Sequence, residues 1–126
     1  MRALALYLAL ASMPLTAHAE VSFSTAVVPI LRVHCVGCHM TGAEPGGLQL
    51  HPAKAYESLV KVPAQTAAML RVSPSDAQHS YLLHKLRGTH LDVGGQGVRM
   101  PFGLAALSAA ELNLIQTWIT EGALNN

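Results

Sequence analysis

Cys35 and Cys38, the two cysteines of this chain, are separated by only two residues, and His39 directly follows the second. A spacing of three brings both thiols to one side of a helical turn, with the imidazole next to them. Two thiols and an imidazole this close together form a site of their own, around which the rest of a short chain has to fold. This stretch therefore limits the fold more than any other part of the sequence.

The first nineteen residues have the three parts of a secretory signal: Arg2 as the positive start, an apolar run over residues 3–11, and the small-residue cleavage site Ala17-His18-Ala19. An uncleaved membrane anchor is the alternative, but such an anchor needs roughly 20 apolar residues. The run is shorter than that, and Pro14 interrupts its continuation. We therefore expect a signal peptide over residues 1–19 and export to the periplasm. The mature domain, residues 20–126, is expected to have no stable membrane insertion.

The mature domain has no net formal charge. Removing residues 1–19 takes away Arg2 and no acidic residue, so seven of the eight Lys and Arg residues remain against seven Asp and Glu. No basic stripe is present to attract nucleic acid. No Lys/Arg cluster indicates binding to an anionic membrane either. Neither partner is expected.

The mature chain is predicted to be one small domain with a marginal core. The whole sequence is 51% hydrophobic and 12% charged, which is typical of a globular protein. It is poor in large aromatic side chains, with one Trp and two Phe. A core of this size is marginal unless a disulfide, a metal or another embedded group supports it.

The periodicity of the sequence predicts an all-α fold of four short helices, since no segment alternates as a strand does. The first is expected from about residue 26 towards 39, with Thr25 as a possible N-cap, and the second within 51–61. The third is expected to start after Ser75 or Asp76 and to stop at Gly88. The glycine-rich span 89–103 is expected to form no element of its own.

The last helix is the clearest of the four. Ser108 and Glu111 have the spacing of a capping box, and the helix is expected to end at Gly122. An apolar stripe marks its buried face and consists of Leu112, Ile115, Trp118 and Ile119.

Three chemistries compete for the Cys35–His39 motif. A structural zinc site needs four ligands, and the chain has no third cysteine, although scattered histidines are available. Thiol–disulfide exchange normally accompanies a βαβ pattern, which is absent here. A disulfide between Cys35 and Cys38 closes so short a loop that it adds little stability.

The third chemistry uses all three residues. In c-type haem attachment, two thiols add to the vinyl groups of a haem, and the histidine that follows becomes the proximal ligand of the iron. Met100, before Pro101 in the glycine-rich span, is the candidate for the opposite axial position, with Met69, His84 and His90 as competitors. A large covalently attached macrocycle also provides the missing centre of the core.

Two further expectations concern the surroundings of a bound haem. The imidazole of a ligating histidine normally donates its other N–H to a fixed acceptor. We expect a backbone carbonyl within residues 43–47 to accept from His39 Nδ1. Arg71, Arg87 and Arg99 are candidates to hold the haem propionates, and Arg99 is preferred because it adjoins Met100.

Beyond the attachment motif, the order of short motifs along the mature chain resembles that of the small class I c-type cytochromes of bacteria. The matching segments are Val27 to Leu31, Cys35 to His39, Gly46 to Leu50, Ser80 to Leu82, Met100-Pro101, Leu107 to Glu111, and Ile115 to Ala123. Phe102-Gly103 departs from the small, glycine-rich turn that is more common after the methionine. The resemblance implies a helical cytochrome c domain around one covalently attached haem c, held by Cys35 and Cys38. His39 and Met100 are then the axial ligands.

The sequence thus predicts an exported monohaem cytochrome c that transfers single electrons between periplasmic redox partner proteins and is not an enzyme. The alternative is a haem enzyme or gas sensor, which must keep a distal coordination position open or openable. A binding module with zinc or a disulfide is a further alternative.

Overall fold

A computed structural model describes residues 19–126, and nearly all of the predicted signal peptide lies outside the described residues. The described chain contains helices and no strand, apart from three isolated β-bridges in the loops. The elements are η1 (Phe23–Val27), α1 (Val28–His34), α2 (Ala55–Leu59), α3 (Tyr81–Arg87), η2 (His90–Val93) and α4 (Ala109–Thr120). The prediction of an all-α class is confirmed at this level.

The first helical segment begins earlier and ends earlier than the sequence predicts. Ser22 rather than Thr25 is the N-cap, because its side chain accepts a hydrogen bond from the Thr25 N–H at 3.2 Å. One π-helical turn, η1, leads directly into α1, and Pro29 occupies the first turn of α1, a position that tolerates proline. The helix ends at His34, so the cysteines follow it on a turn.

The two middle helices are shorter than predicted. The Asp76 carboxylate accepts from the backbone N–H of His79 at 3.1 Å and folds this segment into a local turn. Because that turn takes up residues 76–79, α3 begins only at Tyr81. It ends where predicted, since Gly88 adopts a left-handed conformation with φ of 81°. The expectation of no element in the glycine-rich span is wrong for His90–Val93, which form the 3₁₀-helix η2.

Helix α4 follows the sequence prediction closely. Both hydrogen bonds of the Ser108–Glu111 capping box are present. Ile115, Trp118 and Ile119 are buried, whereas Leu112 is only partly buried against the core. The Trp118 ring packs on Phe23 with ring centroids 5.1 Å apart, so α4 and η1 share the centre of the core.

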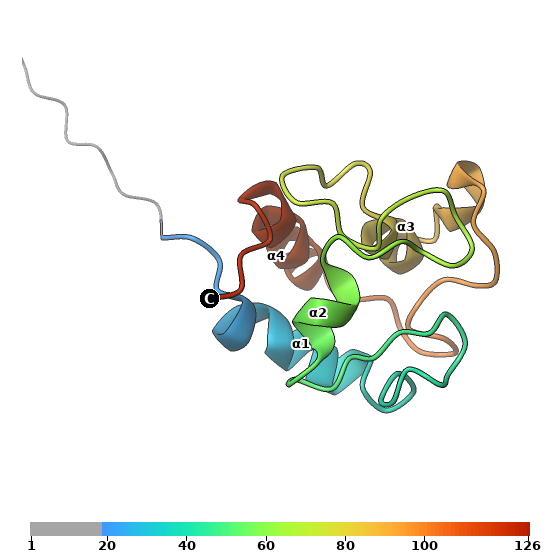
Figure 1. The fold of residues 1–126 in the computed structure, drawn as a ribbon, viewed down its shortest axis with the longest axis horizontal. Coiled ribbons are helices and arrows are strands. Elements are labelled where there is room, and N and C mark those ends of the chain that lie inside the picture. Colours follow the sequence, from blue (N-terminus) through green and yellow to red (C-terminus); the bar gives the residue numbers. More distant parts are fainter. Residues whose placement is uncertain (1–18) are drawn as a thin grey trace, which may run out of the picture.

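The two ends of the described chain lie side by side, as Figure 1 shows for the C-terminal end and the start of η1. The Asn126 backbone carbonyl accepts from the Ser24 N–H at 2.9 Å, and Asn126 Oδ1 accepts from the Phe23 N–H at 2.8 Å. These bonds pair two N–H groups at the start of the first helical segment, which have no partner within it.

Within residues 19–126, no helix has both the length and the apolar character needed to cross a membrane.

A side-chain pair links the end of α1 to the start of α4. His34 Nε2 lies 2.9 Å from Glu111 Oε1. The same carboxylate accepts from the Ser108 backbone N–H at 2.9 Å and from its hydroxyl at 2.8 Å. These hydrogen bonds, first those from Ser108 and then that from His34, lower the pKa of Glu111 to about 2, from an ordinary value of 4.5.

The depressed pKa of Glu111 predicts a loss of stability in acid. Its contribution is complete above pH 4.5 and disappears as the pH falls from there towards 2, because the unfolded chain takes up the proton first. Glu111→Gln should remove this component. Urea unfolding of both proteins between pH 7 and 2 measures this component as the difference between their free energies of unfolding. That difference should become smaller below pH 4.5. A difference that stays constant with pH would contradict the assignment.

Candidate functional site

The two cysteines and His39 lie on a tight turn at the end of α1. The Cys35 carbonyl accepts from the backbone N–H groups of Cys38, at 3.1 Å, and of His39, at 3.0 Å. Sharing one acceptor folds the turn back on itself and keeps the three side chains close together. The His39 carbonyl in turn accepts from the Leu50 N–H at 2.8 Å and closes the loop that follows.

Both cysteines are free thiols, in different surroundings. Cys35 is partly buried against the core, whereas Cys38 is exposed. Burial, reinforced by the neighbouring Cys38, raises the pKa of Cys35 to about 11. A raised thiol pKa is the opposite of what a thiol–disulfide exchange site needs.

The ring of His39 has one buried nitrogen and one that is not buried. Nδ1 is buried and has no hydrogen-bond partner among the described residues, and Nε2 is not buried in this way. Burial lowers the pKa of His39; the Glu44 carboxylate opposes this shift, and the charges of Arg71 and Lys85 add to it. The neutral imidazole, which is the form that binds metals, is therefore favoured.

The predicted acceptor for His39 Nδ1 is not found in this structure. Arg71 takes two of the carbonyls within residues 43–47 instead, because its guanidinium donates to Gly46 at 2.7 Å and to Gly47 at 3.2 Å. It also donates to the Ser58 carbonyl at 2.7 Å and so ties this loop to α2.

Glu44 orders the loop between His39 and these glycines. Its carboxylate accepts from the Thr41 hydroxyl at 2.9 Å and from the Gly42 N–H at 2.8 Å. Hydrogen bonds from its own backbone N–H, from Thr41 and from Gly42 lower the pKa of Glu44 to about 2. A fixed negative charge thus lies near His39.

Met100 lies on a loop that is held against α3. Its side chain is partly buried on the hydrophobic core, and its backbone N–H donates to the Lys85 carbonyl at 2.9 Å. The charge of Lys85 acts on His39. The loop that carries Met100 and the turn that carries His39 therefore border the same region of the molecule.

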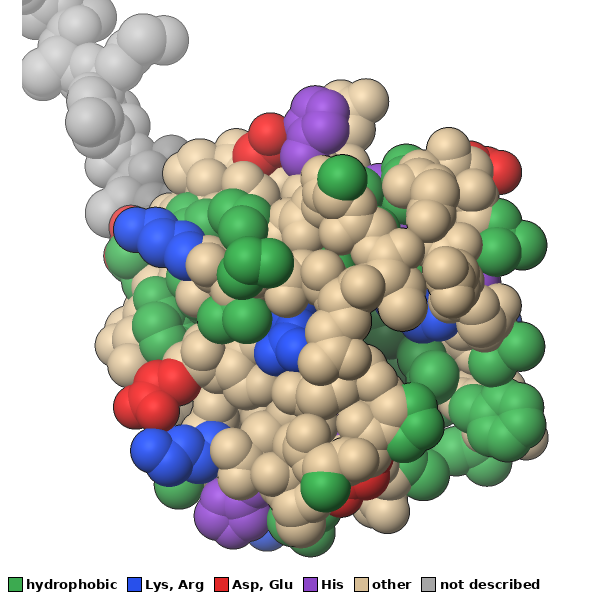
Figure 2. All heavy atoms as spheres, turned by 45° about the vertical axis from the view of Figure 1, so that its right-hand side comes forward, with side chains coloured by type: hydrophobic (Ala, Val, Ile, Leu, Met, Phe, Trp, Pro, Cys, Tyr) green, Lys and Arg blue, Asp and Glu red, His purple; other side chains and the backbone are tan. Residues whose placement is uncertain are grey.

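Figure 2 shows a recess on the right-hand side of that view, with hydrophobic side chains around it and Lys or Arg atoms at its margin. The chain exposes several large apolar side chains close in sequence to the predicted ligands: Met40 follows His39, and Val98, Phe102 and Leu104 flank Met100. Phe102 is 71% exposed and Leu104 61%.

The competitors of Met100 are in different situations. Both ring nitrogens of His84 are engaged, with the Thr89 hydroxyl at 2.8 Å and the Gln78 carbonyl at 2.9 Å. His90 is buried and its Nε2 bonds to the Gly97 carbonyl at 3.0 Å. Met69 lies in the loop between α2 and α3 and is partly buried. Met100 stays the predicted sixth ligand, with Met69 as the alternative.

The three arginine candidates for the haem propionates have different partners in the structure. Arg99, which the sequence preferred, donates to the Leu104 carbonyl at 3.2 Å, and Arg87 donates to Gln116 at 2.5 Å. Of the three, Arg71 is the one whose charge acts on His39. Sequence reasoning missed Lys85 and Glu44 altogether, because a lone charged residue on a helix or in a loop is normally solvated.

The described residues contain no group of three or more His, Cys, Asp or Glu side chains that could hold a metal ion. The four-ligand arrangement of a structural zinc site is thus not assembled in this part of the chain.

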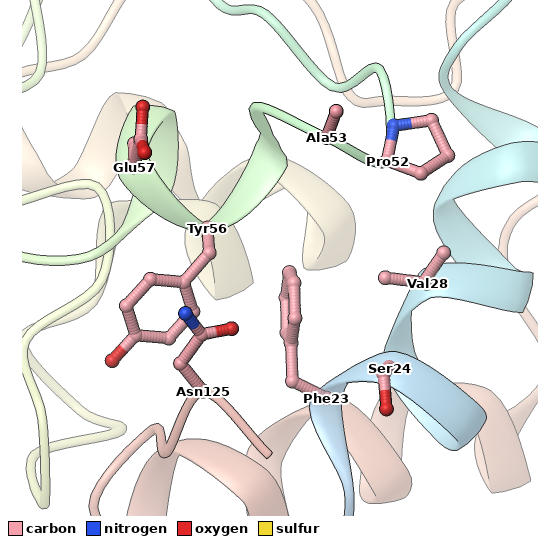
Figure 3. Close-up of a pocket in the computed structure, with 8 residues that line it drawn as sticks. All are labelled: Phe23, Ser24, Val28, Pro52, Ala53, Tyr56, Glu57 and Asn125. Carbon is pink, nitrogen blue, oxygen red and sulfur yellow. The ribbon is translucent and has the colours of Figure 1, made fainter.

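A separate pocket of about 320 Å³ lies between η1, the start of α1, and α2. Figure 3 shows the Phe23 and Tyr56 rings facing it, with Asn125 beside them. The Tyr56 hydroxyl donates to the Ala123 carbonyl at 2.8 Å. No cysteine, histidine or methionine lines this pocket, and it is not part of the site around His39.

Comparison of the chain with protein-family models, with curated proteins and with solved structures gave no match. A function can therefore be inferred only from the residues and the geometry of the site.

The raised pKa of Cys35 predicts slow alkylation in the folded chain without attached haem. A shift from 9.0 to about 11 reduces the thiolate near neutral pH by about 100-fold. Iodoacetamide labelling at pH 7.5, read by peptide mass spectrometry, should show Cys35 reacting about 100-fold more slowly in the native chain than in urea. Cys38 in the same sample is the internal control. Equal rates for Cys35 in both states would contradict the burial of this thiol.

Proposed function

We propose that the protein is an exported monohaem c-type cytochrome that transfers single electrons between periplasmic redox partners. The observation that carries the proposal is the turn after α1, where two free thiols lie next to an imidazole with one unburied nitrogen. The loop that carries a methionine borders the same region. This combination of donors is the one that covalent attachment and two axial ligands require.

The residues present fit a haem. Cys35 and Cys38 would form the two thioether bonds, and His39 Nε2 would be the proximal ligand. His39 is held by the hydrogen bond from its own N–H to the Cys35 carbonyl, so its position is set by the same turn that presents the thiols. The buried, unpartnered Nδ1 leaves one N–H available for an acceptor of the kind that normally fixes a ligating imidazole. When bound, the haem supplies an iron that alternates between the ferrous and the ferric state.

Met100 would be the sixth ligand. Its thioether sulfur is soft and neutral, so it favours ferrous iron and raises the reduction potential, as suits a carrier that keeps its coordination in both redox states. The backbone bond from Met100 to Lys85 keeps the loop on α3, which has four buried side chains and therefore a fixed position in the core.

The helices would enclose the haem as in a cytochrome c domain. The contact of η1 with α4 sets the direction of the first helical segment, which ends at Cys35. Arg71 would meet the haem propionates, because its charge lies near His39 and no carboxylate pairs with it among the described residues. With no net formal charge on the mature chain, redox partners would dock without strong electrostatic steering.

Attachment and processing are tested in one experiment. Expression with a working haem-attachment system should give a coloured protein with a c-type absorption spectrum. Intact mass spectrometry should show a chain that begins at Glu20, carries one haem and has no titratable thiol, because both cysteines belong to the motif. A protein without c-type absorption, or a haem-loaded protein with a free Cys35 or Cys38, would contradict the proposal.

Replacing Met100 distinguishes an electron carrier from a haem enzyme or gas sensor. Met100→Ala should leave the haem attached, remove the sulfur–iron charge-transfer band in the red, lower the reduction potential, and open the iron to carbon monoxide or imidazole. Met69→Ala is the matched control and should leave all four properties unchanged. If Met100→Ala keeps the band and the potential while Met69→Ala loses them, Met69 is the ligand.

A further inference from the structure

Three consecutive backbone carbonyls in the loop before Met100 accept hydrogen bonds from two side chains. Lys85 Nζ donates to the Gln96 carbonyl at 3.1 Å and to the Val98 carbonyl at 2.6 Å. Between them, the Gly97 carbonyl accepts from His90 Nε2 at 3.0 Å. Lys85 and His90 thus hold the whole turn over residues 96–98 from one side.

Lys85 is bonded to this loop through its backbone as well. Its carbonyl accepts from the Met100 N–H at 2.9 Å, so one residue of α3 makes three hydrogen bonds to the five-residue stretch 96–100. Lys85 is partly buried and forms no ion pair within the described residues. Its ammonium group is therefore satisfied by carbonyls of this loop rather than by a carboxylate.

His90 has a fixed tautomer in this arrangement. A carbonyl can only accept, so Nε2 must carry the hydrogen that is donated to Gly97. His90 is 3% exposed, and its backbone carbonyl accepts from the Gly95 N–H at 2.8 Å. The buried ring is thus held to the loop through Nε2, while Nδ1 has no hydrogen-bond partner among the described residues.

The exposed part of the loop, residues 96–98, has little side-chain packing to order it. Gly94, Gly95 and Gly97 give its backbone wide conformational freedom, and Gln96 and Val98 are exposed. Ordering such a backbone has a large entropic cost for each residue, and side-chain burial does not offset it here. The hydrogen bonds from Lys85 and His90 act on this exposed part, whereas Gly95, buried against Tyr81, and Met100, partly buried on the core, order the two ends of the loop.

We propose that Lys85 and His90 are positioning residues that hold the 96–100 loop in the conformation that presents Met100 to the haem iron. This inference rests on the proposed function for the role of Met100. The Lys85–His90 clamp is defined by the bonds to Gln96, Gly97 and Val98. It acts on the ligand only through the backbone of the loop, and neither side chain needs to touch the iron.

The first test of the clamp measures the order of the loop and does not depend on any property of the haem. Amide hydrogen exchange of the full mature chain should be about tenfold faster at residues 96–100 in Lys85→Met than in the wild type, because the ammonium donors to two carbonyls are lost. Exchange in α4 should not change. Lys85→Arg retains the charge and the donors and should restore much of the protection. Lys54→Met, which removes an exposed lysine, is the control for the loss of charge.

The haem-loaded protein tests the effect on Met100. Lys85→Met should keep the covalent haem and bind imidazole about tenfold more tightly than the wild type, since the loop releases the sixth position more often. The sulfur–iron band should disappear at lower temperature, while the far-UV signal of the helices is lost at nearly the same temperature as before. His90→Leu should act in the same direction, and His90→Gln, which keeps a donor near the position of Nε2, less strongly.

The outcomes separate the clamp from the proposed function. Unchanged exchange at residues 96–100 in Lys85→Met would overturn the clamp. Faster exchange there with unchanged imidazole affinity in the haem-loaded variant would show that the clamp orders the loop without positioning Met100, which also overturns the inference. Failure of the proposed function would be seen in the wild type itself, as a protein that carries no haem, and not in a difference between wild type and variant.

Discussion

The packing of Trp118 on Phe23 holds the two ends of the described chain together, and the place of the candidate site depends on it. The two rings lie 5.1 Å apart, and Trp118 Nε1 donates to the Leu124 carbonyl at 2.9 Å. Because η1 continues directly into α1, this contact sets the direction in which α1 points and therefore where Cys35 lies. The pair of His34 and Glu111 holds the far end of α1 on α4 in the same way.

The two predicted axial ligands are held by different kinds of structure. His39 is fixed by a turn of a few residues, through the Cys35 carbonyl. Met100 is fixed from a distance, since the loop that bears it is bonded to Lys85 on α3 and to His90 on η2. A local turn depends little on the rest of the fold. A loop held by hydrogen bonds to other elements can open locally, while the helices stay folded. In the proposed haem-bound protein, we therefore expect Met100 to dissociate from the iron before His39.

Much of the helical framework could be predicted from the sequence, because caps and breakers act locally. The Ser108–Glu111 box begins α4 and Gly88 ends α3 where the pattern indicates. The early end of α1 and the late start of α3 could not be predicted, since each depends on one acceptor, the Cys35 carbonyl or the Asp76 carboxylate, capturing a nearby N–H. The Cys35–His39 motif is visible in the sequence itself, and haem attachment to it stays a prediction. The hydrogen bonds of Lys85 could not be predicted, because its partners are carbonyls eleven and thirteen residues further along.

The charges around His39 would affect the reduction potential of a haem bound at this site. Arg71 and Lys85 disfavour added positive charge at His39, and Glu44 opposes them. In the proposed haem-bound protein the same fields would act on the iron: Glu44 would favour the ferric state, and Arg71 and Lys85 would favour the ferrous state, which carries less positive charge. The methionine sulfur acts in the same direction. Propionates paired with Arg71 would offset part of its field. The potential would then depend on how completely this one arginine is neutralised, rather than on the net charge of the chain.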